Sequence, residues 1–385
     1  MNKKEIKKAE CLYKKSIRLL CSLQLPNGGI LASPHGKRYP YAYSRDHSIC
    51  LLALLEAGLL ERARKGLFFI LQTQKKDGSF PQRVTAERKD ASYKPEQLDN
   101  TALVVYSFAK YIKKSKDVVF AKKESKKIKK ALYYIKKQFM PKEKLFFTLN
   151  SIHEFPPYEA GLEVWANSIC YAALREACPK ERKTRKYLIA VRKGLDRLWD
   201  PVLSCFVKTI RLKEASSVEE RVDASAYSLA DFGILSDQNN RIKKTVKTIY
   251  RKLWYPKLGG ICRYEKDVGR NNGGYGPWSH FTLMLARHFI RLGEKEKADN
   301  FLKWVLGISY HNLLPEHIAT KREFEEWLAE YKTAGLLRPD RKRLIRNIRG
   351  SPLFKRGLAY SVLPLAWPHA EFIRTWLLYK KRFKK

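Results

Sequence analysis

A pattern of helical hairpins that recurs along the chain is the strongest constraint on its fold. In each hairpin an apolar helix is followed by a short polar turn and then by a more charged helix. Successive hairpins begin about 50 to 65 residues apart, in the segments 51–71, 103–135, 166–198, 226–253 and 281–306. Such a repeat is typical of stacked helix pairs, because no pair can bury its apolar face alone. The pattern therefore predicts an all-α fold in which neighbouring hairpins share one core.

The two ends of the chain complete this pattern. A helix over about 365–381 can pair with one over about 4–24, which gives about twelve helices and closes them into a ring. Strand signals are sparse, and short β-prone pieces such as 145–149 and 204–210 should form small ribbons between hairpins. No linker-like or low-complexity segment interrupts the chain, so we expect one domain over residues 1–385. The apolar first helix of each pair should line the inside, and the lysine-rich second helix should face solvent.

Long and short connections alternate along the chain. Turns within hairpins are tight, whereas the connections between hairpins are long and span 25–44, 75–96, 139–159, 199–222, 254–277 and 308–364. In a ring of alternating helices, all long connections lie at one end. Functional residues gather on loops that a rigid scaffold holds in place. We therefore expect the chemistry of this protein at the long-loop end of the ring.

The motifs in these long connections combine carboxylates, arginines and aromatic rings. They read YAYSRD, DGSFPQR, QLDNT, FPPYEAG, RVDAS, ICRYEKD, NNGGYGPW, LLPEH and PLAWPHA. Such residues suit sugars, because aromatic faces pack on C–H faces while charged side chains hydrogen-bond hydroxyl groups strongly. A pair of carboxylates beside such a pocket is what glycosidic hydrolysis requires. The sequence has no nucleophile elbow, phosphate loop or clustered metal ligands, and we expect no metal and no cofactor.

The chain is strongly basic, with 78 Lys and Arg residues against 38 Asp and Glu residues and a net charge of +40. Such a field attracts nucleic acid, anionic lipid and acidic polymers nonspecifically. The lysines lie mainly in runs such as 122–137, where they alternate with apolar residues at helical spacing. We interpret them as the solvated outer faces of helices and expect no specific nucleic-acid partner. The competing hypothesis of a polyanion-binding scaffold rests on charge alone.

Features that report on cellular location point to the cytoplasm. Seven cysteines without a CxxC pair favour reduced thiols over a disulfide framework or a zinc site. The N-terminal segment 1–20 is charged throughout, and no stretch approaches the roughly 18 apolar residues of a membrane span. We therefore expect a cytoplasmic protein without a membrane span.

Taken in order, the motifs resemble those of glycoside hydrolase family fifteen, the glucoamylase family. YxYxRD, DGSFPQR, QLDNT, VDAS, RYE, GGYGPW, LPEH and LAWPHAEFI follow the family's order between residues 28 and 373. The resemblance implies an (α/α)6 toroid and an inverting hydrolase that releases glucose from the nonreducing ends of α-glucans. In that mechanism a carboxylic acid protonates the leaving oxygen while a carboxylate activates water on the opposite sugar face. Prokaryotic relatives usually carry an N-terminal β-sandwich, which we do not expect here because the chain starts at the first toroid helix.

The resemblance also assigns the charged residues that act on the sugar. Glu316 in LLPEH matches the glutamate of the family's Pro/Ser-Glu-Gln segment and is implied to be the general base, although His317 replaces the Gln. Arg45 and Asp46 match the Arg-Asp pair that holds the hydroxyls of the terminal glucose. Arg263 in RYE is expected to contact the same sugar.

Four aromatic residues accompany these charges. Tyr41 and Tyr43 resemble the aromatic wall of the subsite for the terminal glucose, although the family usually has Trp in place of Tyr43. Trp278 in GGYGPW and Trp367 in PLAWPHA either stack on sugar or pack between helices. Asp223 in VDAS is expected to be structural and to cap the eighth helix.

The general acid depends on the alignment. The family's Trp-Glu-Glu segment precedes a glycine that opens the sixth helix, and direct alignment on Gly161 leaves no glutamate at that place. A short deletion instead matches Tyr158-Glu159 to Trp-Glu, which makes Glu159 the candidate acid and Glu154 the second choice. The rival interpretation is that the acid has been lost and that Glu159 is only a helix N-terminal residue.

These alternatives define the competing functions. The first is the exo-acting α-glucan hydrolase, with trehalose or an α-1,6-glucan as other possible substrates. The second is a noncatalytic sugar-binding or regulatory protein on the same fold, because a fold does not entail an activity. A glutamate that faces Glu316 across the pocket favours the enzyme, and the absence of one within reach favours the binding protein.

Overall fold

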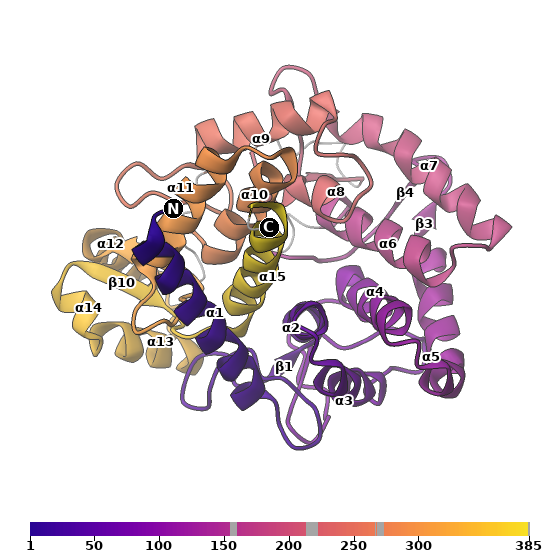
Figure 1. Cartoon of the computed structure of the whole chain (residues 1–385), viewed down its shortest axis with the longest axis horizontal. Helices are drawn as coiled ribbons and strands as arrows, with labels where there is room; N and C mark the ends of the chain where they lie inside the picture. The colour runs from indigo at the N-terminus through magenta and orange to yellow at the C-terminus, as the bar shows by residue number, and fades with distance from the viewer. Residues whose placement is uncertain (155–159, 213–221, 266, 268–272, 384–385) are drawn as a thin grey trace.

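The helices form a closed ring with an inner and an outer layer (Figure 1). The computed structural model describes residues 1–154, 160–212, 222–265, 267 and 273–383. The inner layer consists of α2 (Ser44–Glu56), α4 (Leu98–Ser115), α6 (Val164–Ala177), α8 (Ser228–Asp231), α10 (Ser279–Leu292) and α15 (Ala366–Phe383). Each inner helix contacts the next, and α15 contacts α2, so the ring closes.

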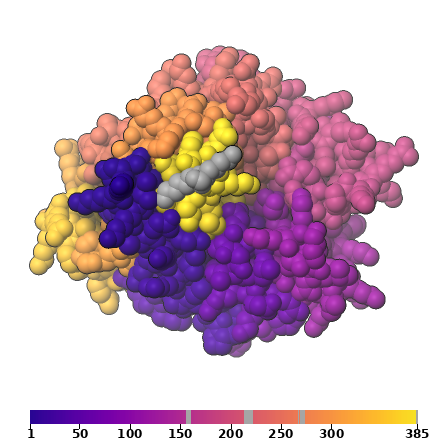
Figure 2. All heavy atoms as spheres, in the orientation of Figure 1, coloured from indigo at the N-terminus to yellow at the C-terminus, as the bar shows by residue number. Residues whose placement is uncertain are grey.

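A second set of helices packs around this inner layer. It consists of α1 (Lys3–Leu23), α3 (Leu60–Leu71), α5 (Val118–Lys137), α7 (Arg182–Leu198), α9 (Asn240–Leu253) and α11 (Lys295–Ile308). The first helix, α1, contacts the last, α15, and the two lie side by side on the face seen in Figure 2. The predicted all-α toroid is therefore confirmed, including the pairing of the two ends of the chain.

The distribution of apolar residues explains the two layers. In α10 every residue from Ser279 to Ile290 is buried, as an inner helix requires. In α9 only one face is buried, while Lys243, Lys244 and Lys247 are exposed. An amphipathic helix with this pattern is stable only on the outside of the ring. In the described part of the chain, each helix is too short or too polar to cross a membrane.

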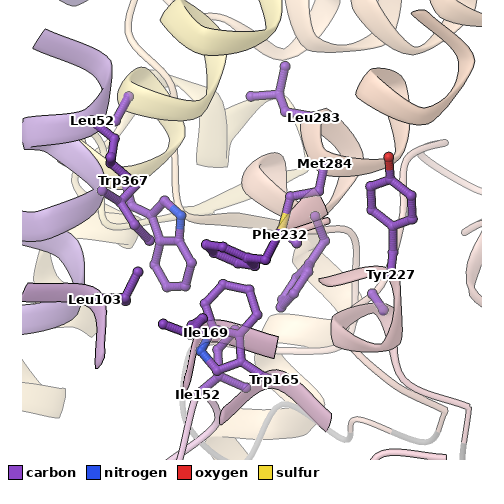
Figure 3. Packing of buried hydrophobic residues seen from close by; sticks show 14 of the residues in the cluster. Leu52, Leu103, Ile152, Trp165, Ile169, Tyr227, Phe232, Leu283, Met284 and Trp367 are labelled. Atoms are coloured by element: carbon purple, nitrogen blue, oxygen red, sulfur yellow. The ribbon is translucent and has the colours of Figure 1, made fainter. Parts of the chain in front are cut away.

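Aromatic and aliphatic side chains of the inner helices pack together in the core (Figure 3). Trp165 of α6 lies between Trp367 of α15 and Phe232, which follows α8, with ring centroids 6.1 Å and 5.6 Å apart. All three side chains are buried. The interior is therefore a packed core, and rings from helices far apart in the sequence close it.

Short antiparallel ribbons lie in or next to the long connections, some within one connection and some between two. They pair β1 (Ala42–Tyr43) with β2 (Arg83–Val84), β3 (Phe139–Met140) with β4 (Leu145–Phe146), β5 (Leu162–Glu163) with β8 (Thr209–Ile210), β6 (Trp199–Asp200) with β7 (Cys205–Phe206), and β9 (His317–Thr320) with β10 (Leu358–Ser361). The ribbons predicted within 145–149 and 204–210 are confirmed. Because β1 and β2 belong to different connections, their pairing fixes two loops of the site side by side.

Asp223 forms a cap as predicted, but at the 3₁₀ turn that precedes the eighth helix, since the N-cap residue of α8 itself is Tyr227. The side chain of Asp223 accepts a hydrogen bond of 2.8 Å from the backbone N–H of Ser225. It does so at the start of a 3₁₀ turn, η1 (Ala224–Tyr227), which leads directly into α8. Asp223 therefore satisfies a backbone donor at this helix start.

The last long connection, 308–364, contains helices that the hairpin repeat did not predict. These are α12 (Lys321–Thr333), α13 (Pro339–Arg349) and α14 (Pro352–Lys355). α12 begins with a capping box formed by Thr320 and Glu323, and α13 begins with Pro339 in its first turn. These start signals are visible in the sequence, but they lie outside the repeat. The extra helices matter because α13 reaches the functional pocket.

Candidate active site

A pocket of about 520 Å³ is built from the long connections. Its size is typical of small-molecule sites. The predicted residues that line it are Tyr41, Tyr43, Arg45, Asp46, Arg263, Trp278, Glu316 and Trp367. Glu154 also lines the pocket, whereas Glu159 lies outside the described residues. The fold thus brings together residues that are more than 300 positions apart in the sequence.

Arg45 is fixed from several sides at the start of α2. Its Nε donates to Oδ2 of Asp99 at 2.7 Å, and its Nη2 donates to Oε1 of Gln97 at 2.8 Å and to the carbonyl of Ser151 at 3.1 Å. Its Nη1 lies 3.6 Å from the carboxylate of Glu154. The guanidinium is buried, and Asp99 on the neighbouring inner helix neutralises it. Arg45 is thus a rigid donor held by its neighbours rather than a simple helix cap.

The carboxylate of Asp46 lies in the same first turn and lines the pocket. Burial raises the pKa of Asp46 to about 7, although the positive charge of Arg45 opposes this shift. A carboxyl group with this pKa can accept or donate hydrogen bonds near neutral pH. It is therefore suited to bind sugar hydroxyls, which are both donors and acceptors.

Tyr41 and Tyr43 form a wall with an arginine that our sequence analysis did not single out. Arg83, in the DGSFPQR motif, donates from Nη1 to the hydroxyl oxygen of Tyr43 at 3.0 Å. Its guanidinium also lies over the ring of Tyr41, 4.3 Å from the centroid. Tyr43 further makes an edge contact with Tyr39 at 5.7 Å. These contacts hold the wall in one orientation.

Glu316 lies where three parts of the chain meet. Its backbone N–H donates to the carbonyl of Ser361 at 3.1 Å, and its carbonyl accepts from the N–H of Ser279 at 3.1 Å. Its Oε2 is buried and has no hydrogen-bond partner among the residues that the structure describes. A carboxylate oxygen of this kind, directed into a pocket, is available to a bound water or substrate.

The charges around Glu316 act in opposite directions. Burial raises the pKa of Glu316 to about 8. The positive charges of Arg38 and Arg263 lower this pKa, whereas the negative charges of Asp46 and Glu154 raise it. The fraction of Glu316 that is ionised at a given pH therefore depends on the two arginines.

Arg263 is locked against protein groups on two sides. Its Nε and Nη2 both donate to Asp267 at 2.9 Å, and its guanidinium lies 4.4 Å from the centroid of Trp278.

The His280 ring stacks on Trp367 with centroids 4.3 Å apart and an angle of 19° between the planes. The two tryptophans therefore pack between protein groups and line the pocket at the same time. The sequence left open whether these tryptophans stack on sugar or pack between helices, and their positions are compatible with both roles.

Several lining residues were missed by the sequence analysis. They are Arg38, Tyr39, Arg83, Tyr93, His153, His280, Arg338, Arg341 and Arg343. Arg83 and His280 lie in or next to recognised motifs, so their positions carried a signal. The arginines of α13 resembled ordinary surface charge, and no local pattern linked them to the pocket. Among the described residues, no group of three or more His, Cys, Asp or Glu side chains is arranged to hold a metal ion.

Comparison with a family model agrees with the sequence motifs. Residues 7–144 match the model described as Glycosyl hydrolases family 15. The predicted resemblance is therefore confirmed over a segment that includes Arg45 and Asp46, and the match supports the expectation of a glycoside hydrolase. No curated protein matches the chain by sequence.

Solved structures confirm the fold over the whole chain. A wild-type glycosidase matches with a TM-score of 0.73 and 16% identity, and the match covers 99% of this chain and 98% of the other. A glycosidase variant in complex with glucose has a TM-score of 0.72, 16% identity and the same coverage. A bacterial glucoamylase in complex with acarbose has a TM-score of 0.67 and 17% identity, and the match covers 97% of this chain but 57% of the glucoamylase. The chain thus has a glucoamylase-like glycosidase fold.

Proposed function

We propose that this protein is an inverting, exo-acting α-glucan hydrolase that releases glucose from nonreducing ends. The observation that carries the proposal is the position of Glu316 in one pocket with Arg45, Asp46 and Arg263. These three charged groups suit the hydroxyls of a terminal sugar, while Glu316 offers a buried carboxylate oxygen to a water molecule. The packed core around Trp165 and Trp367 supports the exo mode, because a glucan chain cannot pass through the ring and has to enter the pocket by one end.

In the proposed reaction, Glu316 is the general base. It takes a proton from a water molecule as the water oxygen bonds to the anomeric carbon. The bond from the anomeric carbon to the glycosidic oxygen breaks, and its electron pair stays on that oxygen. The general acid protonates the leaving oxygen, and β-glucose is the product because water attacks the face opposite the leaving group. Arg38 and Arg263 assist by favouring the ionised form of Glu316.

Glu159 remains our candidate for the general acid. Glu154 also lines the pocket, but its carboxylate lies 3.6 Å from Nη1 of Arg45. A carboxylate in this position holds the guanidinium through a charge-assisted contact and fixes its orientation in the pocket. We therefore assign Glu154 to the orientation of Arg45 and Glu159 to proton donation.

The test is to incubate wild type and Glu316→Gln with maltotriose, panose and trehalose and to follow both glucose release and its anomeric form. We expect wild type to release β-glucose and Glu316→Gln to release at least about 100-fold less, as expected for the loss of a general base. A matched control is Glu326→Gln, because Glu326 lies on the exposed face of α12 and pairs with Arg322. The preferred sugar among the three identifies the linkage.

The noncatalytic alternative makes a different prediction in the same experiment. If wild type binds maltose but releases glucose from none of the three sugars, the protein is a sugar-binding protein on this fold. Release of α-glucose would contradict the inverting mechanism but would still be consistent with a hydrolase.

A further inference from the structure

The cations that line the pocket differ in kind from those on the rest of the protein. The whole chain contains 29 arginines and 49 lysines. The pocket, however, is lined by seven arginines and one lysine. Arginine is the better side chain for anions with two or more oxygens, because its planar fork donates in parallel to two of them. The general basic character of the chain, which is due mainly to lysine, therefore does not account for this composition.

These cations fall into two groups by how closely a carboxylate neutralises them. Arg45 and Arg263 are buried and are neutralised by Asp99 and Asp267. The others form what we call the cationic rim, which consists of Arg38, Arg83, Lys94, Arg338, Arg341 and Arg343. Arg338 and Arg343 are exposed and Arg341 is half-buried, so the part of the rim that α13 contributes lies toward solvent.

Within the described residues, the rim carries more positive charge than its carboxylates neutralise. Asp340 also lines the pocket, and its carboxylate lies 3.5 Å from Nε of Arg38. Arg83, Arg338, Arg341 and Arg343 form no ion pair with a carboxylate among the residues that the structure describes. Four like charges around one opening repel one another, and an anion bound between them relieves this repulsion.

Two of the rim arginines are held in place by neutral groups. Arg341 donates from Nη1 to the carbonyl of Leu336 at 2.6 Å and lies 4.6 Å from the centroid of Tyr331. Arg83 lies between the rings of Tyr41 and Tyr93, 4.3 Å from each centroid. Side chains fixed in this way lose little conformational entropy when they bind a ligand. The rim is thus partly preorganised without being neutralised.

We propose that the cationic rim binds a phosphate or carboxylate group on the leaving-group side of the glycosidic substrate. The location on the leaving-group side rests on the proposed function, which places the terminal glucose against the buried Arg45 and Arg263. The substrate is then an α-glucoside whose second unit carries an anionic group. A neutral glucan would leave the rim arginines unused.

Binding to Glu316→Gln tests the proposal without hydrolysis. We would measure by calorimetry the affinities for trehalose 6-phosphate against trehalose, and for maltobionate, which carries a carboxylate, against maltose. We expect at least one charged sugar to bind about tenfold or more tightly than its neutral partner, since hydrogen bonds to charged groups are strong. The phosphate and carboxylate arms show which anion the rim prefers.

Two double variants on the same helix make a matched comparison. Arg341→Gln/Arg343→Gln removes two positive charges from the rim, whereas Lys342→Gln/Arg346→Gln removes two from positions of α13 that do not line the pocket. We expect the first pair, introduced into Glu316→Gln, to abolish the preference for the charged sugar and the second pair to preserve it. Circular dichroism and thermal unfolding confirm that both fold.

Three outcomes would overturn the proposal. The first is equal affinity for charged and neutral sugars in both arms. The second is an equal loss of preference in the two double variants, which would assign the effect to the overall charge. The third is that heparin binds whereas neither charged sugar does, and that the double variant Arg341→Gln/Arg343→Gln abolishes heparin binding. This result would make the rim a polyanion site. Failure of the hydrolase proposal is distinguishable, because wild type would then release no glucose even if the rim preference is present.

Discussion

Arg45 and Asp99 form a buried ion pair between the first turns of two adjacent inner helices, with Nε and Oδ2 2.7 Å apart. The side chain of Asp99 is completely buried and also accepts a hydrogen bond of 2.9 Å from Nε1 of Trp165. One carboxylate thus connects α2, α4 and α6 at the base of the pocket. The same contact positions the guanidinium of Arg45 in the pocket and holds three inner helices together.

Asp99→Asn should therefore destabilise the protein strongly. The substitution leaves the buried guanidinium of Arg45 without its main counter-charge, and breaking such a pair costs about 3–5 kcal/mol. Urea unfolding measures this loss in the free energy of unfolding. Asp196→Asn is the control, because that carboxylate is 71% exposed in its pair with Arg241 and should contribute about 0–1 kcal/mol. Equal effects in the two variants would show that Asp99 is not a structural anchor.

Arg38→Gln should move the acidic limb of the activity profile to higher pH. In the proposed mechanism Glu316 acts as a base only when ionised, that is, above its pKa, and Arg38 lowers that pKa by its positive charge. Loss of this charge raises the pKa, and we expect a shift of about one pH unit in kcat/KM against pH. Arg38→Lys keeps the charge and should keep the limb in place. An unchanged limb in Arg38→Gln would mean that another group sets it.

Glu159→Gln should impair the enzyme in a way that depends on the leaving group. A general acid is needed when the departing oxygen must be protonated, and its loss costs about 10²- to 10⁴-fold in rate. Fluoride leaves without a proton, so α-glucosyl fluoride should remain a substrate of Glu159→Gln but not of Glu316→Gln. Glu154→Gln should weaken binding of both maltotriose and glucosyl fluoride by releasing Arg45. If Glu154→Gln instead shows the selective defect, Glu154 is the acid.

Protonation of His369 should destabilise the fold as the pH falls. The N–H of Leu314 donates to Nε2 of His369 at 2.9 Å, so Nδ1 of the neutral ring carries the proton, and Oγ of Ser16 lies 2.7 Å from it. Burial lowers the pKa of His369 from 6.5 to about 3. The unfolded state therefore binds more protons than the folded state below pH 6.5. The contribution of the neutral ring to the free energy of unfolding is lost as the pH falls from 6.5 toward 3.

This loss corresponds to about 1.4 kcal/mol per pH unit from one histidine in that range. Denaturant unfolding at several pH values measures the slope, to which His47 adds with the same sign, because burial lowers its pKa to about 4. His369→Gln should reduce the slope by about one proton, whereas replacement of the exposed His311 by Gln should not. An unchanged slope in His369→Gln would contradict the assignment.

The sequence by itself determined the ring and the end of it that carries the pocket. Apolar periodicity is a local property that repeats in every hairpin, and an amphipathic helix can bury its apolar face only against its neighbours. The pairing of α1 with α15 followed from the same argument. The motif residues from Tyr41 to Trp367 were identified because their motifs lie in or next to the long connections and resemble those of glycoside hydrolase family fifteen. Among the helices of the described residues, those within 308–364 lay outside the repeat.

Only the tertiary structure decided how the charges of the site are partnered. Arg45 is adjacent to Asp46 in the sequence, yet its partner is Asp99, which the packing of α4 against α2 brings within 2.7 Å. The pKa of Glu316 likewise depends on burial and on Arg38, which belongs to the other end of the chain. Electrostatic interactions depend on distance in space and on exclusion of water, and neither is encoded in local spacing. For the same reason, the arginines of α13 became part of the pocket only when the last connection folded over it.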